Sequence, residues 1–330
     1  MGELAQPIVG WTDVAALLDP VDTIALLRLV HEHGLRHLLL RYTRSGTPGT
    51  LALVLEAAGN APGARQASPR VRSSPTADTS VAARRLRSGV GAPELASFRV
   101  AIVGCGAVGS AMVDLLFRNG VTRQILLDPD RLRPGNVIRH LADDRHVGLH
   151  KVHATRQRLG EVGLVVDDVD ARVDAIGSPG SALLLMDEVD AVVDATGDEW
   201  TTALLRWAAE STQTTVVSAA VQREGGIARA DRFPAPVGDY LPSVPLRTDL
   251  PAPGREHGCG DAVSNTPPSA VVAAATLGVE LLLAGLSGVS ATPASLLRVL
   301  QPQPDAPYDR LTMLTSPPAA QDPPVTGAPR

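Results

Sequence analysis

The sequence feature that most constrains the fold is a glycine-rich turn between an apolar run and an amphipathic segment. Residues 99–103, RVAIV, are mostly apolar and β-branched, and they stop at the turn 104–109, GCGAVG. After the turn, apolar residues recur at helical spacing until Asn119-Gly120, a pair that predicts the helix end. The stretch therefore predicts a strand, a glycine turn and a helix, which is typical of a turn that holds a phosphate at a helix N-terminus.

Each glycine of this turn has an expected role. Gly104 permits a tight turn, Gly106 lets a phosphate approach the backbone, and Gly109 lets the helix lie close to the sheet. The next apolar run, 124–127, ends in Asp128, whose carboxylate suits the ribose hydroxyls of a nucleotide. A nicotinamide-dependent dehydrogenase has the same turn and acidic residue, so these residues alone leave that alternative open.

Three further motifs separate the two possibilities. The chain continues as Asp128-Pro129-Asp130, then Asn136-Val-Ile-Arg139, then Gly148-Leu-His-Lys151. In this order they resemble the ThiF/MoeB/HesA family, bacterial relatives of ubiquitin-activating enzymes, with its G-x-G-G-x-G, L-x-D-x-D, N-x-x-R and G-x-x-K motifs. The resemblance extends from about Arg84 to about Tyr308.

The resemblance implies an ATP-dependent enzyme that adenylates a carboxylate. Arg139 and Lys151 are then expected to neutralise phosphate oxygens as negative charge builds on the leaving pyrophosphate. Asn136 would hold the same region by hydrogen bonds, and Asp130 would orient the loop or contact the nucleotide. The residues expected to bind ATP and its magnesium are Gly104, Gly106, Ala107, Gly109, Asp128, Asp130, Asn136, Arg139, Lys151 and Asp198.

The composition singles out one of these residues. The chain has 30 Lys and Arg residues, and Lys151 is the only lysine among them. Lysine is a compact point charge and arginine a planar fork, so the two are not interchangeable against a phosphate in a narrow pocket. A chance position on a solvated surface is the alternative, but the lysine stands at the family's ATP-binding position.

The resemblance also implies a magnesium ligand, a reactive cysteine and a departure from the family. The family places a magnesium-binding aspartate directly after a threonine; here Gly197 intervenes, so Asp198 or Asp194 would take the part, or metal binding is altered. Cys259 precedes a proline-started helix as the family's reactive cysteine does, and it could also be an ordinary loop residue. Many relatives hold zinc with two C-x-x-C pairs, but this chain has only 2 cysteines, so no such zinc site is expected.

Composition limits the remaining classes. With 44% apolar and 20% charged residues, the 330-residue chain suits a globular protein with a full core. A net charge of −5 and 3% aromatic residues argue against nucleic-acid binding. No run of eighteen apolar residues and no leader pattern occurs, so we expect a cytoplasmic protein without a membrane association.

The predicted fold class is α/β: a Rossmann-like, mostly parallel sheet with helices on both faces, plus a small N-terminal α+β module. The module is expected to recognise a peptide or carrier protein, or to widen a dimer interface. The Pro-, Ser- and Arg-rich stretch that follows it reads as a linker. The predicted parts are the module 1–60, a disordered linker 61–83, the ATP-binding domain 84–315 and a disordered tail 316–330.

The leading functional prediction is adenylation of the C-terminal carboxylate of a ubiquitin-like sulfur carrier or of a ribosomal peptide precursor. A homodimer is expected, in which an arginine of one subunit reaches the partner's ATP site; the candidates are Arg84, Arg85 and Arg87. Two alternatives remain at this point. One is a nicotinamide-dependent dehydrogenase, and the other is an inactive ThiF-like scaffold that binds a peptide.

Overall fold

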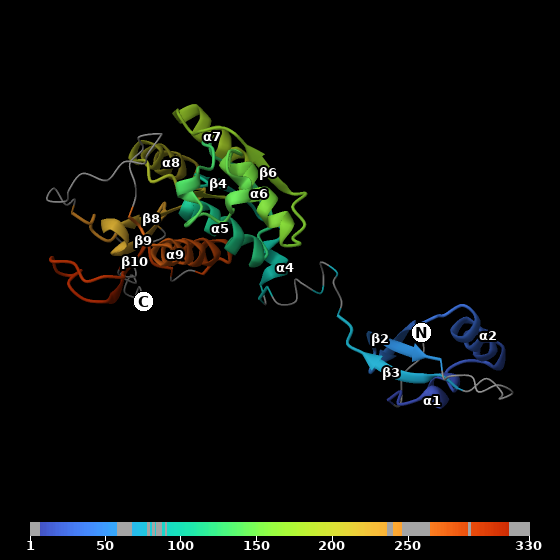
Figure 1. The fold of residues 1–330 in the computed structure, drawn as a ribbon. Helices are drawn as coiled ribbons and strands as arrows, with labels where there is room; N and C mark the ends of the chain where they lie inside the picture. The colour runs from blue at the N-terminus through green and yellow to red at the C-terminus, as the bar shows by residue number, and fades with distance from the viewer. Residues whose placement is uncertain are drawn as a thin grey trace, which may run out of the picture. The chain divides into compact units, whose positions relative to one another are not determined.

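The computed structural model describes residues 7–57, 68–77, 80, 83, 88–89, 91–235, 240–245, 265–289 and 292–316. The chain divides into two compact units, Met1–Ser80 and Val81–Arg330, which are described separately (Figure 1).

The first unit is a three-stranded antiparallel sheet with two helices. The sheet has the order β1-β2-β3. Val14, Leu26, Val30, Leu53 and Leu55 form its buried core. The predicted small α+β module is therefore present. Its elements are α1 (Trp11–Ala15), α2 (Pro20–Glu32), β1 (His37–Arg44), β2 (Thr47–Glu56) and β3 (Arg70–Ser74).

Strand β3 differs from the sequence-based expectation. The predicted linker, 61–83, included Arg70–Ser74, yet these residues pair with β2 along the register Ala52↔Ser74 to Glu56↔Arg70. The strand alternates imperfectly between exposed and half-buried positions, so its sequence carries no clear strand pattern. Pairing with an apolar neighbour, β2, orders a segment whose composition alone favours disorder.

The second unit contains an eight-stranded sheet of order β11-β10-β9-β8-β7-β4-β5-β6. Strands β4 to β8 are parallel to one another, and β9, β10 and β11 continue the sheet antiparallel. The predicted α/β class with a mostly parallel sheet is confirmed. The elements are α4 (Ala92–Leu95), β4 (Arg99–Val103), α5 (Ala107–Arg118), β5 (Arg123–Leu127), α6 (Lys151–Glu161), β6 (Val169–Arg172), α7 (Pro179–Glu188), β7 (Ala191–Asp194), α8 (Glu199–Thr212), β8 (Thr215–Gln222), β9 (Ile227–Phe233), α9 (Pro268–Leu286), β10 (Ser295–Val299) and β11 (Thr312–Thr315).

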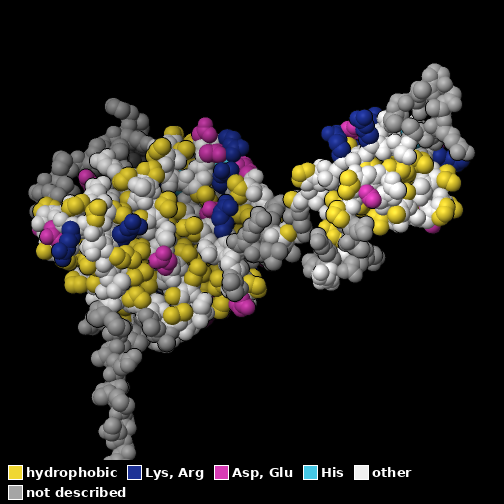
Figure 2. Space-filling model, turned by 90° about the horizontal axis from the view of Figure 1, so that it is seen from below, with side chains coloured by type: hydrophobic (Ala, Val, Ile, Leu, Met, Phe, Trp, Pro, Cys, Tyr) yellow, Lys and Arg dark blue, Asp and Glu magenta, His cyan; other side chains and the backbone are white. Residues whose placement is uncertain are grey.

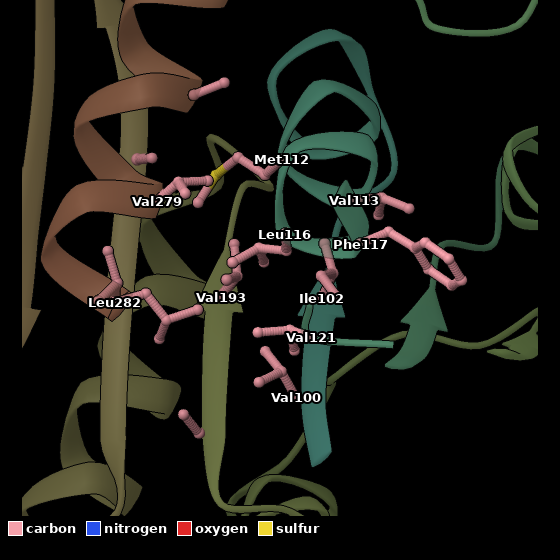
Figure 3. Packing of buried hydrophobic residues seen from close by; sticks show 14 of the residues in the cluster. Val100, Ile102, Met112, Val113, Leu116, Phe117, Val121, Val193, Val279 and Leu282 are labelled. Carbon is pink, nitrogen blue, oxygen red and sulfur yellow. The ribbon is translucent and has the colours of Figure 1, made fainter. Parts of the chain in front are cut away.

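Helices cover both faces of this sheet (Figure 1). Helices α5, α6 and α9 pack on one face, where Figure 3 shows Met112 and Leu116 of α5 meeting Val279 and Leu282 of α9 above Val193. Helices α7 and α8 pack on the other face around a second buried cluster. These two apolar layers fix the carboxyl ends of β4, β5 and β7 relative to one another.

Helix α9 is long and apolar enough to cross a membrane by length and composition, and it is the only such helix in the described part of the chain. It nevertheless packs against α5, β8 and β9. Ala274, Leu281 and Leu282 on it are buried. Its apolar character is therefore accounted for by its place in the core.

Charged side chains of both signs are mixed on one face of the described residues. On the face shown in Figure 2, Lys and Arg side chains lie among Asp and Glu side chains rather than forming one continuous basic surface. Apolar side chains are scattered between them, as on most folded proteins.

Candidate nucleotide site

The glycine turn joins β4 to α5 in a conformation that needs two of its glycines. Gly104 has φ +88°, and a Cβ there would lie 2.8 Å from the backbone of Ala195 and Thr196. A Cβ on Gly109 would lie 1.8 Å from the Gly104 carbonyl oxygen. Gly106 has open space at the same position. The first two glycines are needed for close packing, and Gly106 leaves the helix N-terminus accessible.

Helix α5 therefore begins beside open space. Gly106 is its N-cap, and Ala107 is its first residue. Backbone N–H groups at a helix N-terminus, together with the helix dipole, favour an anion such as a phosphate. The turn has the geometry that the sequence predicted for it.

Asp128 lies at the end of β5, directly beside this turn. Its Oδ2 accepts a hydrogen bond from the Cys105 N–H at 2.8 Å, and its Oδ1 accepts one from the Asp130 N–H at 2.8 Å. The side chain is buried, and this burial raises its pKa, while the nearby Lys151 ammonium and the two N–H groups oppose the rise. The carboxylate thus connects the glycine turn to the loop that follows β5.

A closed loop brings Lys151, the only lysine, next to the acidic residues after β5. Residues 131–150 leave β5 and return, and the Lys151 N–H donates to the Asp130 carbonyl at 2.9 Å. An isolated bridge between Arg131 and His150 closes the base of the loop. The loop explains how two residues far apart in the sequence become neighbours.

The Lys151 side chain points at the acidic residues after β5. Its Nζ lies 2.7 Å from Asp130 Oδ2 and 3.8 Å from Asp128 Oδ2, and the side chain is 15% exposed. Lys151 is the first residue of α6, so the helix backbone fixes the position of its Cα. The ammonium is mostly buried between two carboxylates, on the wall of the cavity described below.

His140 attaches the loop to the glycine turn. Its Nε2 lies 2.8 Å from the Cys105 carbonyl oxygen, and its Nδ1 lies 3.0 Å from the Ala142 N. Burial lowers the pKa of His140 to about 4, and the Lys151 and His146 charges act in the same direction. The ring is therefore neutral near pH 7, with Nε2–H donating to the carbonyl and Nδ1 accepting from the Ala142 N–H. No sequence motif marks this histidine, and its positioning role follows from these contacts.

These elements surround a cavity of about 280 Å³ at the carboxyl ends of β4, β5, β6 and β7. Crevices at this edge of a parallel sheet are where α/β proteins bind their ligands. From the predicted set it includes Gly104, Gly106, Asp128, Asp130, Lys151 and Asp198.

The cavity wall also contains residues that were not predicted to bind the nucleotide. Asp174, Ala175 and Ile176 follow β6, and Thr201 lies in the first turn of α8. The signal for the first three was available in principle, because the segment after each parallel strand reaches the same sheet edge. Val169–Arg172 itself is short and half polar, so its sequence does not stand out as a buried strand.

The structure places Asn136 and Arg139 away from the cavity wall. Asn136 Oδ1 accepts a hydrogen bond from the Arg133 N–H at 3.3 Å, and its carbonyl accepts from the Arg139 and His140 N–H groups. The Arg139 residue is half-buried. Among the described wall residues Lys151 is the only cation, beside the carboxylates of Asp128, Asp130, Asp174 and Asp198.

The two candidate magnesium ligands differ in their surroundings. Asp194 is buried, and its carboxylate accepts hydrogen bonds from Thr196, Thr202 and Ser218, so its oxygens are engaged in the fold. Asp198 lies on the cavity wall and caps α8, where its Oδ2 accepts from Thr201 N and Oγ1, both at 2.8 Å. These two bonds lower the pKa of Asp198. Oδ1 takes part in neither of these hydrogen bonds, so Asp198 fits a magnesium ion that takes one carboxylate oxygen plus phosphate oxygens.

Other predicted residues lie outside the described part of the chain. They are Cys259, the candidate reactive cysteine, and Arg84, Arg85 and Arg87, the candidates for the arginine of a partner subunit. The second cysteine, Cys105, is buried inside the glycine turn, and burial raises the pKa of its thiol well above the usual range.

A second group of ionisable side chains stabilises the loop that carries Lys151. Ligand atoms of Asp143, His146 and Glu161 lie within 4.8 Å of one another. Arg145 forms ion pairs with both carboxylates, at 2.7 and 3.1 Å. Since Arg145 and Arg158 already form ion pairs with these carboxylates, we assign the group to loop stability rather than to metal binding.

Comparison with known proteins agrees with this geometry. Residues 82–239 match the model of the ThiF family. Over 92 residues the chain is 37% identical to the ATP-dependent ubiquitin transferase-like protein Cap2 of Enterobacter hormaechei, covering 28% of this chain and 15% of that protein. Over 69 residues it is 35% identical to the mouse ubiquitin-like modifier-activating enzyme 5, covering 21% of this chain and 17% of that enzyme.

Two solved structures share the fold. E. coli MccB with MccA-N7isoASN has a TM-score of 0.52 at 15% identity, covering 69% of this chain and 66% of that one. PaaA has a TM-score of 0.53 at 12% identity, covering 92% of this chain and 84% of that one. The glycine turn and the parallel strands lie inside the matched stretch, so residues 82–239 resemble the ThiF family in both sequence and architecture.

Proposed function

We propose that the protein is an ATP-dependent adenylyltransferase that activates the C-terminal carboxylate of a ubiquitin-like carrier or of a ribosomal peptide. The observation that carries the proposal is the approach of the only lysine, Lys151, to Asp128 and Asp130 beside the N-terminus of α5. Relatives that match this region are named as activating enzymes for ubiquitin-like proteins, and E. coli MccB has been solved with ATP. The nicotinamide alternative has no counterpart among these matches.

The proposed reaction begins with attack of the substrate carboxylate on the α-phosphorus of ATP. A bond forms between the carboxylate oxygen and Pα, the bond from Pα to the bridging oxygen breaks, and pyrophosphate leaves with that electron pair. Lys151 would leave Asp130 to hold phosphate oxygens, and the N–H groups at the start of α5 would hold another phosphate group. Asp128 would accept hydrogen bonds from the ribose hydroxyls.

Magnesium would supply charge neutralisation that this chain's own cavity lacks. Four carboxylates and a single ammonium line the cavity, so a triphosphate entering alone would meet net negative charge. Asp198 would hold the ion. Arg139, and an arginine from a second subunit of a homodimer, remain proposals for further positive charge, and Cys259 remains a proposal for receiving the activated acyl group.

The central test is nucleotide binding by lysine variants. Titration with a fluorescent ATP analogue in the presence of magnesium is expected to show saturable binding, weakened about tenfold or more by Lys151→Ala. Lys151→Arg should bind the analogue as weakly as Lys151→Ala does, because the longer, planar guanidinium cannot take the position of the ammonium. Arg156→Ala on the exposed side of α6 is the matched control and should leave affinity unchanged. Stronger binding of NADH than of ATP would contradict the proposal.

The second test addresses catalysis. Isotope exchange between pyrophosphate and ATP, in the presence of candidate peptides or carrier proteins with a free C-terminus, is expected in the wild type and lost in Lys151→Ala. ATP binding without exchange, for a partner shown independently to bind the protein, would instead favour the peptide-binding scaffold. The excess of carboxylates over cations on the cavity wall is the observation that favours this second candidate, the peptide-binding scaffold.

A further inference from the structure

The turn after β8 borders a second cavity, which the nucleotide chemistry does not use. Its volume is about 660 Å³, and its wall combines the turn residues Arg223 and Glu224, the lead-in to α9 at Asn265, and Gln301 and Gln303 after β10. Because β8 runs parallel to β7, the turn after it lies at the same sheet edge as the glycine turn. Figure 1 shows β8, β9, β10 and α9 together in this part of the unit.

Arg223 is the unusual residue of this cavity. Its side chain is only 5% exposed. Nη2 donates to the Pro245 carbonyl at 2.6 Å and lies 3.4 Å from Asp305 Oδ2. Nε and Nη1 are buried and make no hydrogen bond to any described residue. A buried charged group with unpaired donors is costly, and such a group in a native fold calls for a partner.

The surrounding turn holds Arg223 in place. Arg223 and Glu224 have φ of 53° and 52°, left-handed conformations that non-glycine residues rarely adopt. A Cβ on Gly225 would lie 2.3 Å from Pro267 Cδ, and a Cβ on Gly226 would lie 2.3 Å from Gln303 Nε2. The Gly226 carbonyl also accepts from the Leu300 N–H at 2.7 Å. Strained residues persist where their surroundings determine them, and they cluster at ligand sites.

The donors and acceptors on the wall indicate the class of ligand. Arg223 lies on the wall, and a guanidinium matches a carboxylate, which it binds through charge-assisted hydrogen bonds. The side-chain amides of Asn265, Gln301 and Gln303 supply donors and acceptors that suit peptide groups. Glu224 on the same wall repels anions, so a carboxylate has to bind in direct contact with the guanidinium.

We propose that this Arg223 cavity binds a carboxylate-bearing peptide segment, at the sheet edge that also carries the nucleotide cavity. The identification of that peptide as the substrate to be adenylated rests on the proposed function. Carboxylate binding itself does not depend on it, because no residue of the nucleotide cavity contributes to this wall.

The test uses two blocked tripeptides, acetyl-Ala-Asp-Ala-amide and acetyl-Ala-Asn-Ala-amide, with the full-length protein and no nucleotide. Saturation-transfer NMR is expected to detect the aspartate peptide and to show binding at least about tenfold weaker for the asparagine peptide. Arg223→Gln should weaken the aspartate peptide by a similar factor. Lys151→Ala should leave it unchanged, which separates this cavity from the nucleotide cavity. Free aspartate, which lacks peptide groups, should bind more weakly than the peptide.

A further variant keeps the proposal falsifiable if Arg223→Gln does not fold. Glu224→Gln removes a carboxylate from the wall and is expected to strengthen binding of the aspartate peptide several-fold, with circular dichroism unchanged. Equal binding of the two peptides, loss of binding in Lys151→Ala, no gain in Glu224→Gln, or no binding at all would overturn the proposal. Since pyrophosphate exchange is measured separately, its absence would remove the substrate assignment without touching the carboxylate result.

Discussion

A single buried histidine connects the loop that carries Lys151 to the glycine turn. His140 donates from Nε2 to the Cys105 carbonyl and accepts at Nδ1 from the Ala142 N–H. Only the neutral ring makes both bonds, because an imidazolium has two donors and no acceptor. Protonation of this side chain therefore removes one bond at the base of the nucleotide site and places a charge in a buried position.

The depressed pKa of His140 gives a prediction for the pH dependence of stability. An unfolded histidine titrates near 6.5, and His140 in the folded protein titrates at about 4, so the unfolded chain takes up the proton first as the pH falls. The contribution of His140 is fully present above pH 6.5 and is lost as the pH falls to about 4. The loss is on the order of 3 kcal/mol in the free energy of unfolding.

Urea unfolding at a series of pH values between 7 and 4 measures this loss. His140→Gln should unfold more easily than the wild type at pH 7 and should lose less stability on acidification. The matched control is His153→Gln, at an exposed position on α6, which should keep the wild-type pH dependence. A His140→Gln variant with an undiminished pH dependence would show that other groups account for the acid sensitivity.

At the scale of elements, the turn from β4 to α5 separates packing from ligand access. Gly109→Ala would bring a methyl group to 1.8 Å from the Gly104 carbonyl oxygen, and overpacking of this kind costs about 1–3 kcal/mol of stability. Gly106→Ala meets no atom within 4 Å and has φ −73°, a value that alanine adopts freely. The two variants should therefore fail in different ways.

Thermal unfolding and ATP titration distinguish them. Gly109→Ala should lower the unfolding temperature, with ATP binding lost because the turn is displaced. Gly106→Ala should unfold at the wild-type temperature but bind ATP about tenfold more weakly, since its methyl group occupies the space left for a phosphate. Normal ATP affinity in a well-folded Gly106→Ala would place the phosphates elsewhere.

The elements that the sequence predicted well are those fixed by local chemistry. The run 99–103, the glycines 104–109 and the helix end at Asn119-Gly120 each show a short-range pattern, and the structure has β4, the turn and α5 there. Strand β3 was missed because it depends on pairing with β2, which is remote in sequence and leaves little trace in a polar edge strand. Long-range pairing is the information that periodicity does not contain.

The same distinction holds for the site. Gly104, Asp128, Asp130, Lys151 and Asp198 were found because each stands at a strand end or in a motif, and the fold gathers them on one cavity wall. The bonds that hold the site together, such as His140 to the Cys105 carbonyl, join segments that no spacing relates. Arg139 shows the converse, since its place in a motif did not put it on the described cavity wall.

At the scale of the whole molecule, the described residues that form both cavities belong to the second unit. Val81–Arg330 has its own apolar layers on the two faces of its sheet, and Met1–Ser80 has a separate core of five buried residues. Each core excludes water without residues from the other unit, so each unit should be stable on its own. We therefore expect nucleotide binding to depend on the second unit alone.

Removing residues 1–80 tests this division. The fragment 81–330 should keep its circular dichroism spectrum and bind ATP within about twofold of the full chain, because every described wall residue of the nucleotide cavity is retained. If the first unit recognises a peptide or carrier, the fragment should also lose exchange with that partner while keeping its ATP affinity. A folded fragment that no longer binds ATP would contradict the division, because it would make the first unit part of the nucleotide site.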